Sequence, residues 1–137
     1  MTGMHAWDPE DTAHRAGVPV HTVTLPGQLA GCTDGHQVWV DRRLTTVERR
    51  CTIGHELVHV WAGHTGHQPP KVESWVRRHT ANLLLQGCDV HGALRSESTL
   101  WDAAESLGVT VPVLLDQLHS HIGPAGPITS GGSSWSC

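Results

Sequence analysis

The chain has 137 residues, a length typical of one domain, and 38% of them are hydrophobic, which suffices for a modest core. A formal net charge of −4 excludes the basic surface expected of a protein that binds nucleic acid or an anionic membrane. No apolar run is long enough to span a bilayer, and the first residues lack the basic start and apolar stretch of a secretory signal peptide.

The cysteines are scattered without C-x-x-C spacing, at Cys32, Cys51, Cys88 and Cys137. We interpret them as reduced thiols of a cytoplasmic protein rather than as a disulfide frame. Cys51 falls inside a predicted helix, where we expect it to pack as a small hydrophobic residue.

The first third of the chain predicts one short helix followed by strands. Residues 5–17 fit a helix that ends at a glycine. Three β-forming segments follow, at 18–25, 29–33 and 36–41. Asp34-Gly35 lies between the last two of them and predicts a β-hairpin.

Residues 45–62 predict a long helix that carries the most informative motif. Thr45 and Glu48 have the spacing of a capping box. His55-Glu56-Leu57-Val58-His59 matches the H-E-x-x-H pattern, in which both imidazoles share one helix face and can bind one zinc ion. Glu56 can then reach a water on that ion. The alternative is a chance match in a chain with twelve histidines.

A second helix is expected to begin near Pro70 or Lys71. Its expected inner stripe consists of Val72, Val76, His79 and Leu83. Glu73, in the first turn, can fold back towards the two histidines as a third ligand, an arrangement that leaves one position for water and is typical of catalytic zinc. The alternative is that Glu73 is only a helix N-terminal carboxylate that the helix dipole stabilises.

The run from Arg50 to His64 resembles the ImmA/IrrE family of metallopeptidases, whose members typically read R-x-T-[small]-H-E-L-x-H-x-x-x-G-H. The run from Glu73 to Leu85 is similar, in register, to that family's E-x-x-A-x-x-F-A-A-x-L-L-M segment. The similarity extends from about Val38 to Leu118, and its specific part is confined to 50–85. The chain departs from the pattern at Val76, His79, Thr80 and Gln86.

The resemblance implies a small zincin-like fold in which zinc is held by His55, His59 and Glu73, with Glu56 as the general base. It also implies a protein substrate, plausibly a helix-turn-helix repressor of a mobile element or stress regulon. In zincins generally, a substrate peptide is thought to lie antiparallel along an edge strand beside the active helix. Val38–Val40 is our candidate for that edge, and the alternative is that this strand lies inside the sheet.

Many zincins use a tyrosine or a histidine to support the tetrahedral intermediate, and this chain has no tyrosine. A backbone N–H is one candidate for this support. The candidate side chains, either there or beside the metal, are His64, His79 and Arg77. For His64 the alternative is a structural cap, and for His79 it is a core histidine.

Beyond residue 85 the sequence predicts a loop with one helical turn, two helices over 100–107 and 113–121, and a tail rich in Gly, Pro and Ser over 123–137. Residues 103–118 superficially resemble a helix-turn-helix, which would make the chain a DNA-binding module. The second of these helices has no Lys or Arg, so we interpret the segment as packing. The tail residues Trp135 and Cys137 have no assigned role.

We therefore expect one α+β domain over residues 1–122 that acts as a zinc metallo-endopeptidase, with Zn²⁺ as its cofactor. Its expected partner is a protein substrate, without direct contact to nucleic acid or membrane. The alternative from another class is a zinc-binding regulatory or anti-repressor protein that acts by binding, without turnover.

Overall fold

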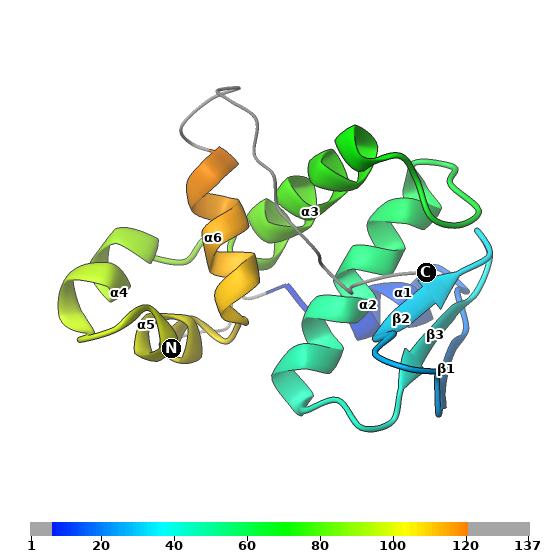
Figure 1. Cartoon of the computed structure of the whole chain (residues 1–137), viewed down its shortest axis with the longest axis horizontal. Coiled ribbons are helices and arrows are strands. Elements are labelled where there is room, and N and C mark those ends of the chain that lie inside the picture. Colours follow the sequence, from blue (N-terminus) through cyan, green and yellow to red (C-terminus); the bar gives the residue numbers. More distant parts are fainter. Residues whose placement is uncertain (1–6, 121–137) are drawn as a thin grey trace.

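The computed structural model describes residues 7–120, which form an α+β structure of six helices and one three-stranded sheet (Figure 1). The elements are, in chain order, α1 (Pro9–Arg15), β1 (Val20–Val23), β2 (Gly31–Thr33), β3 (Val38–Asp41), α2 (Thr46–Trp61), α3 (Pro70–Leu84), α4 (Val90–Ser96), α5 (Leu100–Leu107) and α6 (Val111–Ser120). The predicted α+β class is confirmed. The predicted tail, with Trp135 and Cys137, lies outside the described residues.

The sheet has the strand order β1-β3-β2. β1 pairs with β3 in parallel, from Val20↔Val38 to Val23↔Asp41, and β2 pairs with β3 antiparallel. β3 is therefore the interior strand, and the prediction that Val38–Val40 forms the edge is wrong. The physical reason is the parallel pairing of β1, which gives β3 a second neighbour. β2 is the edge strand that packs against α2.

The predicted hairpin at Asp34-Gly35 is confirmed, since it joins the antiparallel strands β2 and β3. Asp34 Oδ1 accepts hydrogen bonds from the N–H groups of His36 and Gln37, both at 2.8 Å. Gly35 has a φ of +97°, which a residue with a side chain rarely adopts. The local sequence therefore determines where this turn forms.

Helix α2 has the start and the end that its caps predict. The Thr45 side chain accepts from the Glu48 N–H and the Glu48 side chain accepts from the Thr45 N–H, which completes the predicted capping box. Gly63 follows the helix with a φ of +81°. All residues from Cys51 to His59 are buried, because the sheet covers one side of α2 and α3 covers another (Figure 1).

Two hydrophobic cores lie on either side of α2. The first, between α2, α1 and the sheet, consists of Ala13, Val38, Val40, Ile53 and Leu57. The second joins α2 to α3 and the C-terminal helices and includes Cys51, Ala81, Leu84, Ala104 and Leu114. Cys51 is buried there as a free thiol, as expected of a small hydrophobic residue. Helix α2 thus contributes to both cores, and this position fixes the helix that carries the H-E-x-x-H motif.

The buried stripe of α3 differs from the predicted one. Its buried residues are Glu73, Val76, Thr80, Ala81 and Leu84. His79, predicted for the inner face, is exposed and stacks on the Trp75 ring, with ring centroids 4.9 Å apart. Each residue turns the helix by about 100°, so a stripe through Glu73 and Thr80 leaves position 79 facing outwards.

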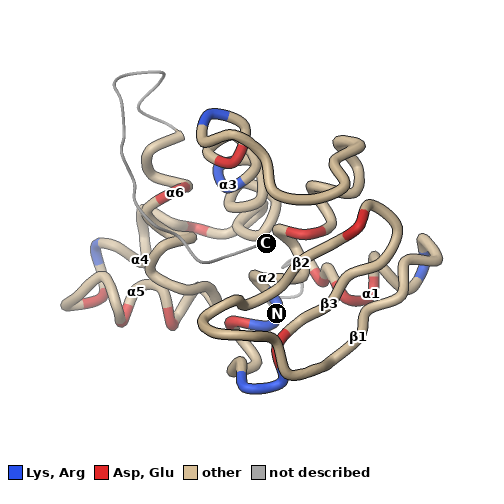
Figure 2. The backbone as a smooth tube through the Cα atoms, turned by 45° about the vertical axis from the view of Figure 1, so that its right-hand side comes forward, with Lys and Arg blue, Asp and Glu red and all other residues tan. Residues whose placement is uncertain are grey.

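Helices α5 and α6 pack into the second core through residues that include Val113 and Leu114. They meet at Gly108, whose φ is +75°. Helix α6 carries one acidic residue, Asp116, and no Lys or Arg (Figure 2). Without Lys or Arg, α6 has no positive charge that could bind a phosphate backbone. This agrees with the interpretation that residues 103–118 pack against the core rather than bind DNA. Within residues 7–120, no helix has the length and apolar character needed to cross a bilayer.

Candidate metal centre

His55 and His59 lie one turn apart on the buried part of α2. Their ring centroids are 5.0 Å apart and their planes are inclined by 66°. The two residues are 2% and 1% exposed, respectively. The helical spacing thus places two imidazoles together in a site largely shielded from solvent, as the motif predicts.

Glu73 reaches the two histidines from the first turn of α3. Its Oε1 lies 3.4 Å from His55 Nε2 and 3.2 Å from His59 Nε2. One ligand atom from each of the three residues lies within 4.8 Å of the other two. We call His55, His59 and Glu73 the metal-site cluster. The structure brings together the three residues that the sequence predicts as ligands.

The donor set of the metal-site cluster suits a divalent metal ion, because imidazole nitrogens and a carboxylate oxygen are its common ligands. Burial lowers the pKa of His55 more than its hydrogen bond with Glu73 raises it, which favours the neutral imidazole that binds metals. Burial alone raises the pKa of Glu73, but hydrogen bonds from His55, His59 and the Gln68 N–H outweigh it and lower that pKa. Glu73 is therefore held as a carboxylate.

Glu56, adjacent to His55 in the motif, is completely buried. Neither of its carboxylate oxygens has a hydrogen-bond partner among the described residues. Because buried polar atoms are nearly always hydrogen-bonded, such a carboxylate makes Glu56 a candidate functional residue. Burial, with the charge of Glu73 adding to it, raises the pKa of Glu56 well above its usual range. Raised carboxyl pKa values are typical of groups that exchange protons near neutral pH.

The edge strand β2 passes close to Glu56. A Cβ atom on Gly31 would lie 3.6 Å from Glu56 Cγ and only 2.5 Å from Thr52 Cγ2. A residue with a side chain would therefore clash with α2 at this point. Gly31 was not predicted as a site residue, since its role depends on how β2 packs against α2.

The loop of residues 63–69, between α2 and α3, contacts two members of the metal-site cluster. His64 Nδ1 lies 2.9 Å from His59 Nδ1. The Gln68 N–H donates to Glu73 Oε2 at 2.8 Å, and His67 Nδ1 lies 3.6 Å from the same oxygen. Of these three loop residues, only His64 was predicted as a candidate supporting residue. The Gln68 contact comes from the main chain, so no residue pattern signals it.

The other two candidate supporting residues lie in different surroundings. His79 is exposed and stacked on Trp75. Arg77 Nε lies 3.7 Å from Asp116 Oδ2, which ties α3 to α6. Burial is the main cause that lowers the pKa of His55, and the positive charge of Arg77 is a smaller cause in the same direction. Arg77 is thus close enough to affect the cluster, whereas His79 faces solvent.

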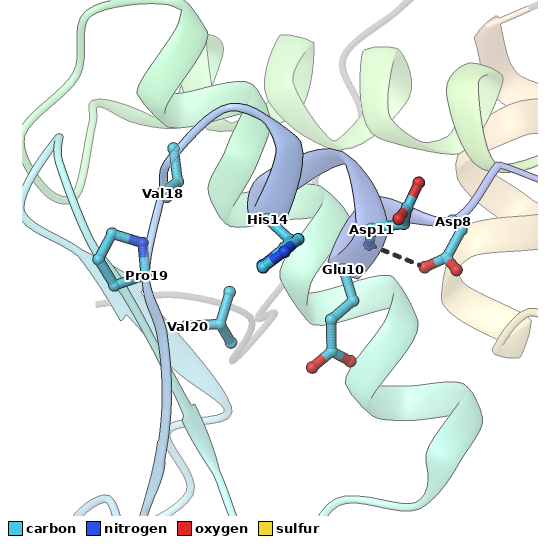
Figure 3. Close-up of a pocket in the computed structure, with 7 residues that line it drawn as sticks. All are labelled: Asp8, Glu10, Asp11, His14, Val18, Pro19 and Val20. Atoms are coloured by element: carbon cyan, nitrogen blue, oxygen red, sulfur yellow. Dashed lines mark hydrogen bonds between the residues drawn. The ribbon is translucent and has the colours of Figure 1, made fainter.

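A pocket outside the metal-site cluster lies between α1 and the start of β1 (Figure 3). It is lined by Asp8, Glu10, Asp11, His14, Val18, Pro19 and Val20. Asp8 is the N-cap of α1. Its side chain accepts a hydrogen bond from the Asp11 N–H, drawn as the dashed line in Figure 3. No lining residue belongs to the cluster, so this pocket is not part of the candidate site.

Comparison with known proteins gives no relative from which function could be transferred. No family model, no curated protein and no solved structure matches the chain. The resemblance to the ImmA/IrrE family stays a prediction from the two motifs.

Proposed function

We propose that the chain is a zinc-dependent metallo-endopeptidase with a small zincin-like fold. The observation that carries this proposal is the buried metal-site cluster together with Glu56, a buried carboxylate without a hydrogen-bond partner among the described residues. Structural zinc sites are usually closed by four protein ligands, whereas three ligands are typical of catalytic sites. The motifs that resemble the ImmA/IrrE family support the same assignment.

The roles of the site residues follow from their positions. His55 and His59 would hold the ion through Nε2 and Glu73 through Oε1, the atoms that converge. Bound zinc supplies Lewis acidity, which activates a water and polarises the scissile carbonyl. Glu56 accepts the proton of the attacking water and delivers it to the leaving amine.

For the substrate peptide we propose the outer edge of β2. Among the described residues β2 pairs with β3 on one side, so a peptide can add along its other side through main-chain hydrogen bonds. Gly31 of this strand lies next to Glu56. A peptide on this edge would run beside the general base. This assignment replaces the interior Val38–Val40 strand.

For the substrate class we propose a helix-turn-helix repressor, as the resemblance implies. A main-chain site of this kind requires a segment that can extend, such as a linker or a locally unfolded helix. Incubation with the repressor encoded nearest to the chain, followed by mass spectrometry of the products, would identify the scissile bond.

Replacing Glu56 with Gln tests the catalytic assignment, because the amide has the same size but cannot accept the proton. We expect zinc binding to persist and the cleavage rate to fall by about 10²–10⁴-fold. Glu105→Gln, at an exposed position on α5, is the matched control and is expected to cleave at the wild-type rate.

Wild-type cleavage by Glu56→Gln would contradict the catalytic role of Glu56. Release of a repressor from its operator that survives Glu56→Gln, without any cleavage product, would instead favour the zinc-binding regulator that acts without turnover. Zinc content and cleavage must therefore be measured on the same preparations.

A further inference from the structure

His59 contacts a second residue through the ring nitrogen that does not face Glu73. Its Nε2 lies near Glu73, whereas its Nδ1 lies 2.9 Å from His64 Nδ1. The two rings have centroids 5.1 Å apart and planes inclined by 59°. A distance of 2.9 Å between two ring nitrogens requires a hydrogen bond in which one donates and the other accepts.

We propose that His64 is a positioning residue, which accepts a hydrogen bond from His59 Nδ1 and thereby presents His59 Nε2 to the metal. This inference rests on the proposed zinc site. Without the metal, His59 Nε2 can donate to Glu73. Once Nε2 binds the metal, a neutral imidazole carries its proton on Nδ1, so His59 is then the donor of the pair. His64 then accepts at Nδ1 and keeps its own proton on Nε2.

The main chain of His64 is held at the end of α2. The His64 N–H donates to the His59 carbonyl at 2.9 Å, at the end of α2. Gly63, which precedes it, has a φ of +81° and turns the chain out of the helix. On the other side lies the β2–β3 turn, where a Cβ on Gly35 would lie 3.2 Å from the His64 carbonyl oxygen. The backbone that carries the His64 ring thus lies between the helix end and the hairpin.

The structural role of His64 and the proposed role depend on different atoms. The cap on α2 uses the main-chain N–H of residue 64, which every substitution except proline retains. The contact with His59 uses the side chain alone. Substitutions that differ only in their ability to accept a hydrogen bond at the Nδ1 position therefore separate the two roles.

His64→Leu and His64→Asn form such a pair, since the Asn Oδ1 can accept where Nδ1 did and Leu offers no acceptor. We expect His64→Leu to weaken zinc binding by about 10–100-fold, as is usual for loss of a hydrogen bond to a metal-bound histidine. We expect His64→Asn to bind zinc nearly as tightly as the wild type. His91→Leu, at an exposed position on α4, is the control for loss of a histidine.

The measurement is the zinc dissociation constant of the full chain, from competition with a chelating dye, with circular dichroism of each metal-free variant to check its fold. Equal zinc affinity of His64→Leu and the wild type would overturn the positioning role and leave the proposed function intact. Equal weakening in His64→Leu and His64→Asn would also overturn it, since the acceptor would then not matter. A wild-type protein that binds no zinc would overturn the metal centre itself, and this role with it.

Discussion

At the scale of single residues, the molecule places three buried carboxylates in three different surroundings. Glu56 has no hydrogen-bond partner among the described residues, and burial raises its pKa. Glu73 is also buried, but two histidines and the Gln68 N–H lower its pKa. Asp41 is held by the Arg43 side chain and by the Leu25 N–H, and its pKa lies far below its usual range. The surroundings thus distinguish a proton carrier, a ligand and a structural anchor.

Replacing Asp41 with Asn should lower the free energy of unfolding at pH 7. Asp41 accepts hydrogen bonds from Arg43 Nε at 2.7 Å and from the Leu25 N–H at 2.8 Å. Because its pKa is lowered in the folded state, its contribution is present above the unfolded value of about 3.9 and is lost as the pH falls below it. The measurement is urea unfolding of both proteins between pH 3 and pH 7.

We expect the difference in unfolding free energy between wild type and Asp41→Asn to narrow as the pH falls below about 4, because Asp41 of the unfolded wild-type chain then takes up a proton whereas the folded form, with its lowered pKa, does not. Asp102→Asn, at an exposed position on α5, serves as the matched control. A difference that stays constant from pH 7 to pH 3 would show that the ionised form of Asp41 does not stabilise the fold.

The residues of the metal-site cluster were predictable because helical geometry alone joins His55 to His59. The approach of Glu73 was predictable only as one of two readings, since it depends on how the loop folds back. The position of His79 was predicted wrongly, because the inner stripe of α3 follows Glu73 and Thr80 rather than a purely apolar pattern. Where a polar ligand and a threonine face inwards, hydrophobic periodicity gives the wrong face.

At the scale of elements, local signals predicted the helices, the three strand segments and the hairpin, but not the order of the strands in the sheet. The capping box at Thr45 and the glycine at position 63 fixed α2, since caps act within one turn. The hairpin at Asp34-Gly35 was equally local. The interior position of β3 was not predictable, because the parallel partner β1 lies earlier in the chain and no short motif encodes that pairing.

Gly31→Ala tests how closely β2 must pack against α2. The added Cβ would lie 2.5 Å from Thr52 Cγ2 and 3.0 Å from the Trp39 carbonyl oxygen, so β2 must shift away from the helix. We expect the free energy of unfolding to fall by about 1–3 kcal/mol, the usual cost of overpacking. If the substrate peptide lies along β2, cleavage should fall by more than the lost stability explains.

Adding Thr52→Ser to Gly31→Ala removes the methyl group that the new Cβ meets and should recover part of the stability. Denaturant unfolding of the single and double variants measures this recovery. An Ala variant as stable as the wild type would mean that β2 and α2 are less closely packed than the structure indicates.

At the scale of the whole molecule, α2 is the element on which both cores and the metal-site cluster depend. Arg50 of this helix donates to the main-chain carbonyls of Trp7, Leu84 and Gly108, which ties the N-terminal segment, the end of α3 and the α5–α6 turn to α2. The sequence predicted the α+β class and the C-terminal helices. It did not predict these tethers, because a guanidinium that binds three distant carbonyls leaves no periodic pattern.

The central claim is that His55, His59 and Glu73 bind one zinc ion, and zinc K-edge X-ray absorption of the protein loaded with one equivalent of zinc tests it most directly. We predict a first shell of nitrogen and oxygen at about 2.0–2.1 Å, outer-shell scattering from two imidazoles and no sulfur. A sulfur shell at about 2.3 Å would contradict the assignment, because it would place zinc on cysteines. An unchanged spectrum in the variant that combines His55→Ala with His59→Ala would contradict it equally.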